Sequence, residues 1–99
     1  MSKQANYFVG YRAEREAKHL LEKEGYNVIR AAGSHGLFDL AAFSKTDVRL
    51  IQLKVISFDE KRIFQKEQME LKNLPVCPFI RKELWVYEKH RGWHYYLCS

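Results

Sequence analysis

The chain has 99 residues, enough for one small domain and too few for two, so we expect a single domain over residues 1–99. Hydrophobic residues make up 46% and charged residues 29% of the chain, which excludes an intrinsically disordered protein. No apolar run approaches the ~20 residues of a membrane-spanning helix, and the first residues lack the apolar core of a signal peptide. We therefore expect an intracellular, cytoplasmic protein whose net charge of +5 favours polyanionic partners such as nucleic acid.

The spacing of the apolar residues predicts two helices and five strands. The expected ranges, in chain order, are a helix over 7–24, strands over 26–31, 37–43 and 48–55, a helix over 60–73, and strands over 84–87 and 93–97. Gly25 provides the cap of the first helix, and a capping-box pattern over 57–60 opens the second. The side chains expected on the buried side of that second helix are Ile63, Phe64, Leu71 and Leu74. The order α-β-β-β-α-β-β predicts an α/β (α+β) domain in which a mixed central sheet of about five strands is flanked by two helices.

A polar group is expected where the second and third strands pair. The loop 44–47 has the form of a hairpin connection, and counting back from it places Asp39 opposite Gln52. Lys54, two residues further along its strand, points to the same face as Gln52. A carboxylate, an amide and an ammonium are thus expected on one patch, whereas the alternate residues Arg49, Ile51, Leu53 and Val55 face the other side.

This combination of side chains suits a divalent cation. Magnesium prefers hard oxygen ligands, which the Asp39 carboxylate and the Gln52 side-chain carbonyl can supply. An adjacent ammonium, that of Lys54, could orient a metal-bound water and balance the charge that develops on a phosphate. The alternative is a structural Asp–Lys ion pair at the end of a half-buried hairpin.

A second carboxylate and a loop histidine each have two possible interpretations. A second carboxylate could come from either Glu14 or Glu16, which lie at opposite boundaries of the apolar arc of the first helix. His35, in a glycine-bearing loop before Asp39, could contact a phosphate or assist proton transfer, or be a plain exposed histidine.

An ordered set of short motifs resembles the archaeal-type Holliday junction resolvases of the PD-(D/E)XK nuclease superfamily. The resemblance covers about residues 11–55, and each motif by itself is weak. In order, the motifs are Ala13-Glu14-Arg15-Glu16, Gly25-Tyr26-Asn27-Val28-Ile29-Arg30, Ala32-Gly33-Ser34, Phe38-Asp39-Leu40 and Gln52-Leu53-Lys54.

The resemblance implies a magnesium-dependent endodeoxyribonuclease, with Mn²⁺ able to replace Mg²⁺, that acts on branched DNA such as Holliday junctions. It selects Glu14 over Glu16 as the carboxylate of the first helix, and it implies a homodimer, because resolvases act as dimers. The implied catalytic residues are Glu14, Asp39, Gln52 and Lys54. The implied metal ligands are Glu14, Asp39, Gln52 and the carbonyl of Leu53. The implied DNA contacts are Arg15, Arg30 and Ser34. His35 is a further candidate from its position in the loop and not from the resemblance.

The sequence departs from the family pattern at one position. Gln52 occupies the place of the ExK glutamate, and a neutral amide binds a metal ion more weakly than a carboxylate. Two alternative functions follow. One is a non-catalytic, dimeric DNA-binding module with a degenerate site, and the other is a nuclease for ordinary duplex or single-stranded DNA.

Overall fold

A computed structural model describes residues 3–31 and 37–98, with side chains from residue 10 onward in the first helix. The elements, in chain order, are α1 (Lys3–Lys23), β1 (Asn27–Arg30), β2 (Leu40–Phe43), β3 (Val48–Ile56), α2 (Gln65–Asn73), β4 (Ile80–Glu88) and β5 (Gly92–Leu97). This order is the one that the sequence predicts. Within the described ranges, neither helix combines the length and the apolar character that crossing a membrane requires.

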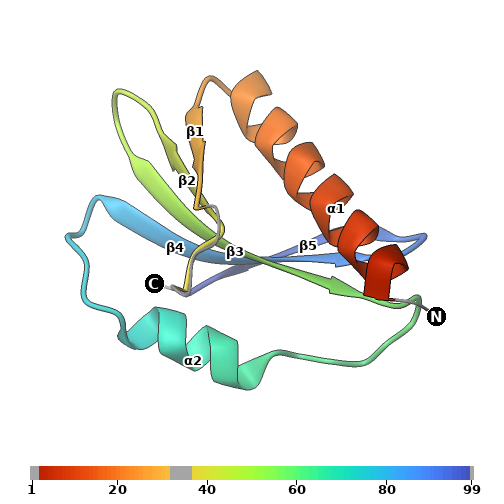
Figure 1. The fold of residues 1–99 in the computed structure, drawn as a ribbon. Coiled ribbons are helices and arrows are strands. Elements are labelled where there is room, and N and C mark those ends of the chain that lie inside the picture. The colour runs from red at the N-terminus through yellow and green to blue at the C-terminus, as the bar shows by residue number, and fades with distance from the viewer. Residues whose placement is uncertain (1–2, 32–36, 99) are drawn as a thin grey trace.

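The five strands form one sheet in which spatial order equals chain order, β1-β2-β3-β4-β5. The β3–β4 pair is parallel and the other three pairs are antiparallel, so the sheet is mixed, as expected. In Figure 1, α1 covers one face of this sheet and α2 lies on the other. The two helices thus divide the core into two layers.

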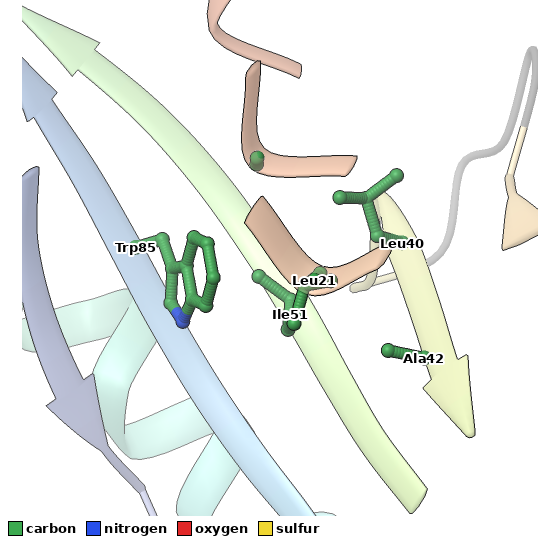
Figure 2. Close-up of a cluster of buried hydrophobic side chains, with 6 residues drawn as sticks. Leu21, Leu40, Ala42, Ile51 and Trp85 are labelled. Atoms are coloured by element: carbon green, nitrogen blue, oxygen red, sulfur yellow. The ribbon is translucent and has the colours of Figure 1, made fainter. Parts of the chain in front are cut away.

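The first layer packs α1 against β2, β3 and β4. Figure 2 shows Leu21 of α1 meeting Leu40, Ile51 and Trp85, which come from three adjacent strands. Leu21 and Ile51 are fully buried, which confirms the apolar arc predicted for the helix. This packing fixes the helix on the sheet and with it the polar residues at the boundary of the arc.

The second layer packs α2 and the end of β3 against the opposite face of the sheet. Its buried side chains are Ile56, Phe64, Leu71, Leu84, Val86 and Cys98. Since Ile51 belongs to the first layer and Ile56 to the second, side chains along β3 alternate between the α1 and α2 sides.

The C-terminal end of α1 has the predicted glycine cap. Gly25 has a φ of 97°, a left-handed conformation that glycine adopts without steric cost. Its N–H donates to the carbonyl of Glu22 at 3.0 Å, and the N–H of Tyr26 donates to the carbonyl of Leu21 at 3.1 Å. These two bonds form a Schellman motif, which ends the helix and turns the chain into β1.

The predicted register of the β2–β3 hairpin is confirmed where the ladder forms. Phe43 pairs with Val48 and Leu40 with Ile51, as the loop 44–47 requires. Within this loop the hydroxyl of Ser44 donates to the carboxylate of Asp47 at 2.8 Å. A short side-chain bond of this kind stabilises the turn and so the alignment of the two strands.

The start of α2 was predicted wrongly. The carboxylate of Glu60 accepts a bond from the N–H of Ser57 at 3.1 Å, as in a capping box, but the helix begins only at Gln65. Phe64 has a φ of 54°, and this left-handed residue separates the turn at 57–60 from the helix. Ile63 is consequently 66% exposed instead of buried, whereas Phe64 and Leu71 are buried as expected.

β4 is longer than its apolar pattern predicts because it pairs with β3 along all nine of its residues, from Ile80 to Glu88. Its buried Lys82 donates from Nζ to the carbonyls of Lys72 at 3.0 Å and Leu74 at 2.7 Å. Carbonyls at the end of a helix lack intrahelical partners, so this ammonium satisfies them and holds α2 to the sheet.

Candidate metal and DNA site

Two of the predicted carboxylates meet in one cavity, which we call the Glu14 cavity. Its volume is about 310 Å³, and its walls come from the middle of α1, the end of β1, the residue before β2 and the second half of β3. The residues that line it are Gly10, Tyr11, Glu14, Arg30, Asp39, Leu53 and Val55. The fold therefore brings Glu14 and Asp39 together from positions 25 residues apart.

Asp39 lies where β2 leaves the ladder. The last ladder pair is Leu40 with Ile51, and the N–H of Asp39 donates to the carbonyl of Ile51 at 2.9 Å. The Asp39 carboxylate then takes the place of a backbone acceptor, since its Oδ2 accepts a bond from the N–H of Leu53 at 2.7 Å. This bond orients the carboxylate without neutralising its charge.

Glu14 reaches the cavity from the boundary of the apolar arc of α1. Its carboxylate forms an ion pair with Nε of Arg30, at the end of β1. The guanidinium of Arg30 also lies over the ring of Tyr11, 5.9 Å from the ring centroid. Arg30 is therefore held by an acid and an aromatic ring that lie one turn apart on the same helix.

Glu16, the alternative to Glu14, points elsewhere. Its carboxylate accepts a hydrogen bond from Nε1 of Trp93 at 3.1 Å. It lines a different cavity, together with Arg12, Ala13 and Tyr87. The structure thus places Glu14, and not Glu16, with Asp39.

Gln52 and Lys54 do not line this cavity, which differs from the single patch expected from the sequence. By the alternation along β3 they lie on the α2 side, and Nζ of Lys54 is 3.9 Å from the carboxylate of Glu67 on α2. The physical reason is that Asp39 leaves the ladder one residue early, so its carboxylate meets the backbone of Leu53 rather than the side chain of Gln52.

Gln52 has one further property that bears on a ligand. Its Oε1 is buried, and no hydrogen-bond partner for it is found among the described residues. A buried carbonyl oxygen without a partner carries a desolvation cost of ~1–3 kcal/mol. A cation or an ordered water at this oxygen would remove that cost.

Three further residues were predicted to contact DNA, and the structure describes only one of them, Arg15. Arg15 lines a second cavity of about 200 Å³, which shares Tyr11, Glu14 and Arg30 with the Glu14 cavity. Ser34 and His35 lie outside the described residues. Tyr11 was missed by the sequence analysis, although its position three residues before Glu14 puts both on one helix face.

The oxygen donors present fit magnesium. In the part of the chain that the structure describes, no three His, Cys, Asp or Glu side chains are grouped so that they could hold a metal ion. Magnesium is usually bound through one or two carboxylates and keeps several waters. Two carboxylates in one cavity meet that requirement.

Comparison with known proteins gives consistent results. A family model described as "Archaeal holliday junction resolvase (hjc)" matches residues 5–75. The chain is 47% identical over 64 residues to the crossover junction endodeoxyribonuclease Hjc of Methanocaldococcus jannaschii. This match covers 65% of the chain and 47% of the relative, so the chain spans about half the length of the curated relative it matches.

The fold has a counterpart among solved structures. The structure of Hjc from Archaeoglobus fulgidus, described as a Holliday junction resolvase from an archaeal hyperthermophile, matches with a TM-score of 0.70 at 20% identity. The match covers 90% of this chain and 72% of that one, and it confirms the predicted fold class.

The family match spans well over half of the chain and includes Glu14, Asp39 and the segment 52–54. It confirms the resemblance that the short motifs indicate. The chain belongs to the archaeal Holliday junction resolvase (Hjc) family.

Proposed function

We propose that this chain is a metal-dependent endodeoxyribonuclease that cuts branched DNA, with four-way junctions as its preferred substrate. The observation that supports this most directly is the cavity in which Glu14 and Asp39 meet beside Arg30. Two acids and a guanidinium in one cavity can hold a cation and a phosphate together. Membership of the Hjc family adds support, since a relative bears the name crossover junction endodeoxyribonuclease.

The proposed ligands of the cation are the carboxylates of Glu14 and Asp39, the amide oxygen of Gln52 and the main-chain carbonyl of Leu53. We propose Mg²⁺ as the natural cation, with Mn²⁺ able to replace it. When bound, such a cation polarises a phosphoryl oxygen and lowers the pKa of a coordinated water. The chain's own contribution is to fix the ligands, and the Leu53 N–H does this for Asp39.

The basic residues near the cavity have proposed roles towards the DNA. Arg15 and Arg30 would hold backbone phosphates, and Lys54 would position the attacking water and stabilise the charge that develops on phosphorus. Ser34 and His35 are proposed as further backbone contacts. Backbone contacts carry no sequence information, so the substrate would be recognised by its shape.

We also propose that the active form is a homodimer. A four-way junction has two symmetry-related strands, and two copies of one site are needed to cut both. Closed twofold dimers are the commonest oligomers of soluble proteins.

A cleavage assay on a panel of substrates tests the proposal. The protein would be incubated with a labelled four-way junction, a flap, a linear duplex and a single strand, each with Mg²⁺, with Mn²⁺ or with EDTA. We expect cation-dependent cutting that is fastest on the junction. Equal rates on the duplex would favour a general nuclease, and no cutting of any substrate would contradict the enzymatic function.

A second candidate function is a non-catalytic, dimeric DNA-binding module. Two observations favour it: an amide stands at position 52, and Lys54 lies near Glu67 rather than in the Glu14 cavity. In this case the chain would bind junctions with or without a divalent cation and would leave them intact.

The substitution Gln52→Glu separates these candidates. A carboxylate here would replace the neutral amide that is proposed as a ligand, so we expect tighter Mn²⁺ binding by about tenfold, the lower end of the range of effects known for outer-shell partners of metal ligands. If the wild type cuts DNA, cleavage at limiting Mg²⁺ should rise. Calorimetric titration with Mn²⁺ measures the first effect and gel assays the second. Cleavage by Gln52→Glu but not by the wild type would establish the non-catalytic module.

A further inference from the structure

Three residues form a compact group between the two cavities: Tyr11 and Glu14 on α1 and Arg30 on β1. All three line both the Glu14 cavity and the cavity that contains Arg15. Arg30 bonds the carboxylate of Glu14 through Nε, and its guanidinium lies over the ring of Tyr11. One cation thus has two partners on a single helix face.

The ion pair between Arg30 and Glu14 is of the kind that exchanges easily. The side chain of Arg30 is 48% exposed and that of Glu14 is 24% exposed. Pairs of this exposure contribute little to stability, because water and salt screen them and because fixing two side chains costs entropy. The fold does not depend on this ion pair, so Glu14 can exchange Arg30 for another cation at a small cost in free energy.

A divalent cation and the guanidinium of Arg30 would compete for this carboxylate. A cation at Glu14 would repel the guanidinium and weaken its bond to the acid. The Tyr11 ring offers Arg30 a second contact, since an arginine within ~6 Å of an aromatic centroid is attracted to the face of the ring. Arg30 would therefore remain beside the Tyr11 ring, where it lines both cavities, with its charge no longer neutralised.

We propose that Arg30 is an exchangeable counter-ion of Glu14, and that Tyr11 is a positioning residue that keeps the released guanidinium where a DNA phosphate can bind it. In the absence of a divalent cation, Arg30 neutralises Glu14 and is unavailable to DNA. With a cation at Glu14, Arg30 turns to the phosphate. This inference rests on the proposed function, because it assigns Glu14 to the cation and Arg30 to the DNA.

The proposal makes cation binding and phosphate binding interdependent. The cation frees Arg30 for the phosphate, and the phosphate frees Glu14 for the cation. Each ligand should therefore raise the protein's affinity for the second ligand by the same factor. The group would keep the protein from binding DNA tightly before the cation is in place.

The first test measures cation affinity without any cleavage. Mn²⁺ would be titrated calorimetrically into the wild type, Arg30→Gln and Arg12→Gln. Without its competing guanidinium, Glu14 should bind Mn²⁺ about two- to fivefold more tightly in Arg30→Gln, the range expected for an exposed ion pair. Arg12→Gln removes the same charge beside a different cavity, next to Glu16, and should leave the affinity unchanged.

The second test measures DNA binding with Ca²⁺ under conditions in which denaturing gels show that the DNA stays intact. The gain in affinity for a four-way junction on adding Ca²⁺ should be about two- to fivefold smaller in Arg30→Gln and in Tyr11→Ala than in the wild type. Tyr11→Phe keeps the ring and should behave as the wild type. Melting temperatures would confirm that all variants are folded.

Unchanged or weaker Mn²⁺ binding in Arg30→Gln would overturn the proposal, as would an unaltered Ca²⁺ effect in both Arg30→Gln and Tyr11→Ala. Failure of the proposed nuclease function would give a different result, because the cleavage assay would then show no cutting of DNA. A protein that cuts nothing but binds Mn²⁺ more tightly after Arg30→Gln would still support the counter-ion exchange.

Discussion

Asp39→Asn should reduce the rate of junction cleavage in Mg²⁺ by more than about 100-fold, since loss of an outer-shell partner alone typically costs 10–100-fold at a metal site. The substitution removes the negative charge but keeps an oxygen that can accept the bond from the N–H of Leu53. The backbone around the site should therefore stay in place. Single-turnover cleavage of a labelled four-way junction measures the rate.

Asp59→Asn is the matched control for this change. Asp59 pairs with Arg91, does not line the Glu14 cavity and has a φ of 62°, which asparagine tolerates. Its cleavage rate should equal that of the wild type. If Asp39→Asn has the same melting temperature as the wild type and still cuts at full rate, Asp39 is not a metal ligand.

Glu83→Ala should lower the free energy of unfolding by about 3–5 kcal/mol, because it leaves a buried guanidinium without its main partner. Glu83 binds Arg49 through two bonds of 2.7 and 2.8 Å, and it accepts a third bond from Nε1 of Trp85 at 2.9 Å. The two charged side chains are only 8% and 13% exposed. Urea denaturation followed by tryptophan fluorescence measures the loss.

Glu24→Ala provides the comparison, since Glu24 also contacts Arg49, at 3.3 Å, but is 59% exposed. Its removal should cost no more than about 1 kcal/mol. Equal costs for the two substitutions would show that burial of the Arg49–Glu83 pair has no special effect on stability.

Acidification should narrow the stability difference between the wild type and Glu83→Ala. Burial raises the pKa of Glu83, but the hydrogen bonds from Arg49 and Trp85 together with the charge of Arg49 outweigh this effect. The pKa of Glu83 therefore lies below its usual value. A carboxylate of this kind stabilises the fold above its unfolded-state pKa, and the contribution is lost as the pH falls through the folded-state pKa. A gap that widens towards acid pH would contradict this account.

The parts of the fold that the sequence predicts well depend on local signals. The cap at Gly25 and the loop at 44–47 each act within a few residues, and both were located correctly with the register that follows. The predicted start of α2 was wrong because Phe64 adopts a left-handed conformation while its ring is buried in the core. The predicted length of β4 was too short for a related reason, since its outer residues are ordered by pairing with β3 and not by their own apolar pattern.

The candidate site shows the same division. Helical spacing places Glu14 at the edge of the buried arc, and the hairpin brings Asp39 to β3. The sequence does not show that Asp39 would leave the ladder and bond a backbone N–H. It also gives no sign that Arg30 would pair with Glu14, because contacts between separate elements depend on how the helix packs on the sheet.

The order of the strands in the sheet has a consequence for how the molecule forms. Every strand lies beside its neighbours in the chain, so three of the four pairings close through short connections, and only the parallel β3–β4 pairing needs the long crossover through α2. Closing a loop costs entropy that grows with its length, and a topology rich in sequence-local contacts reaches its native state quickly. The meander of the first three strands can therefore assemble early, with the crossover and the last hairpin joining it afterwards.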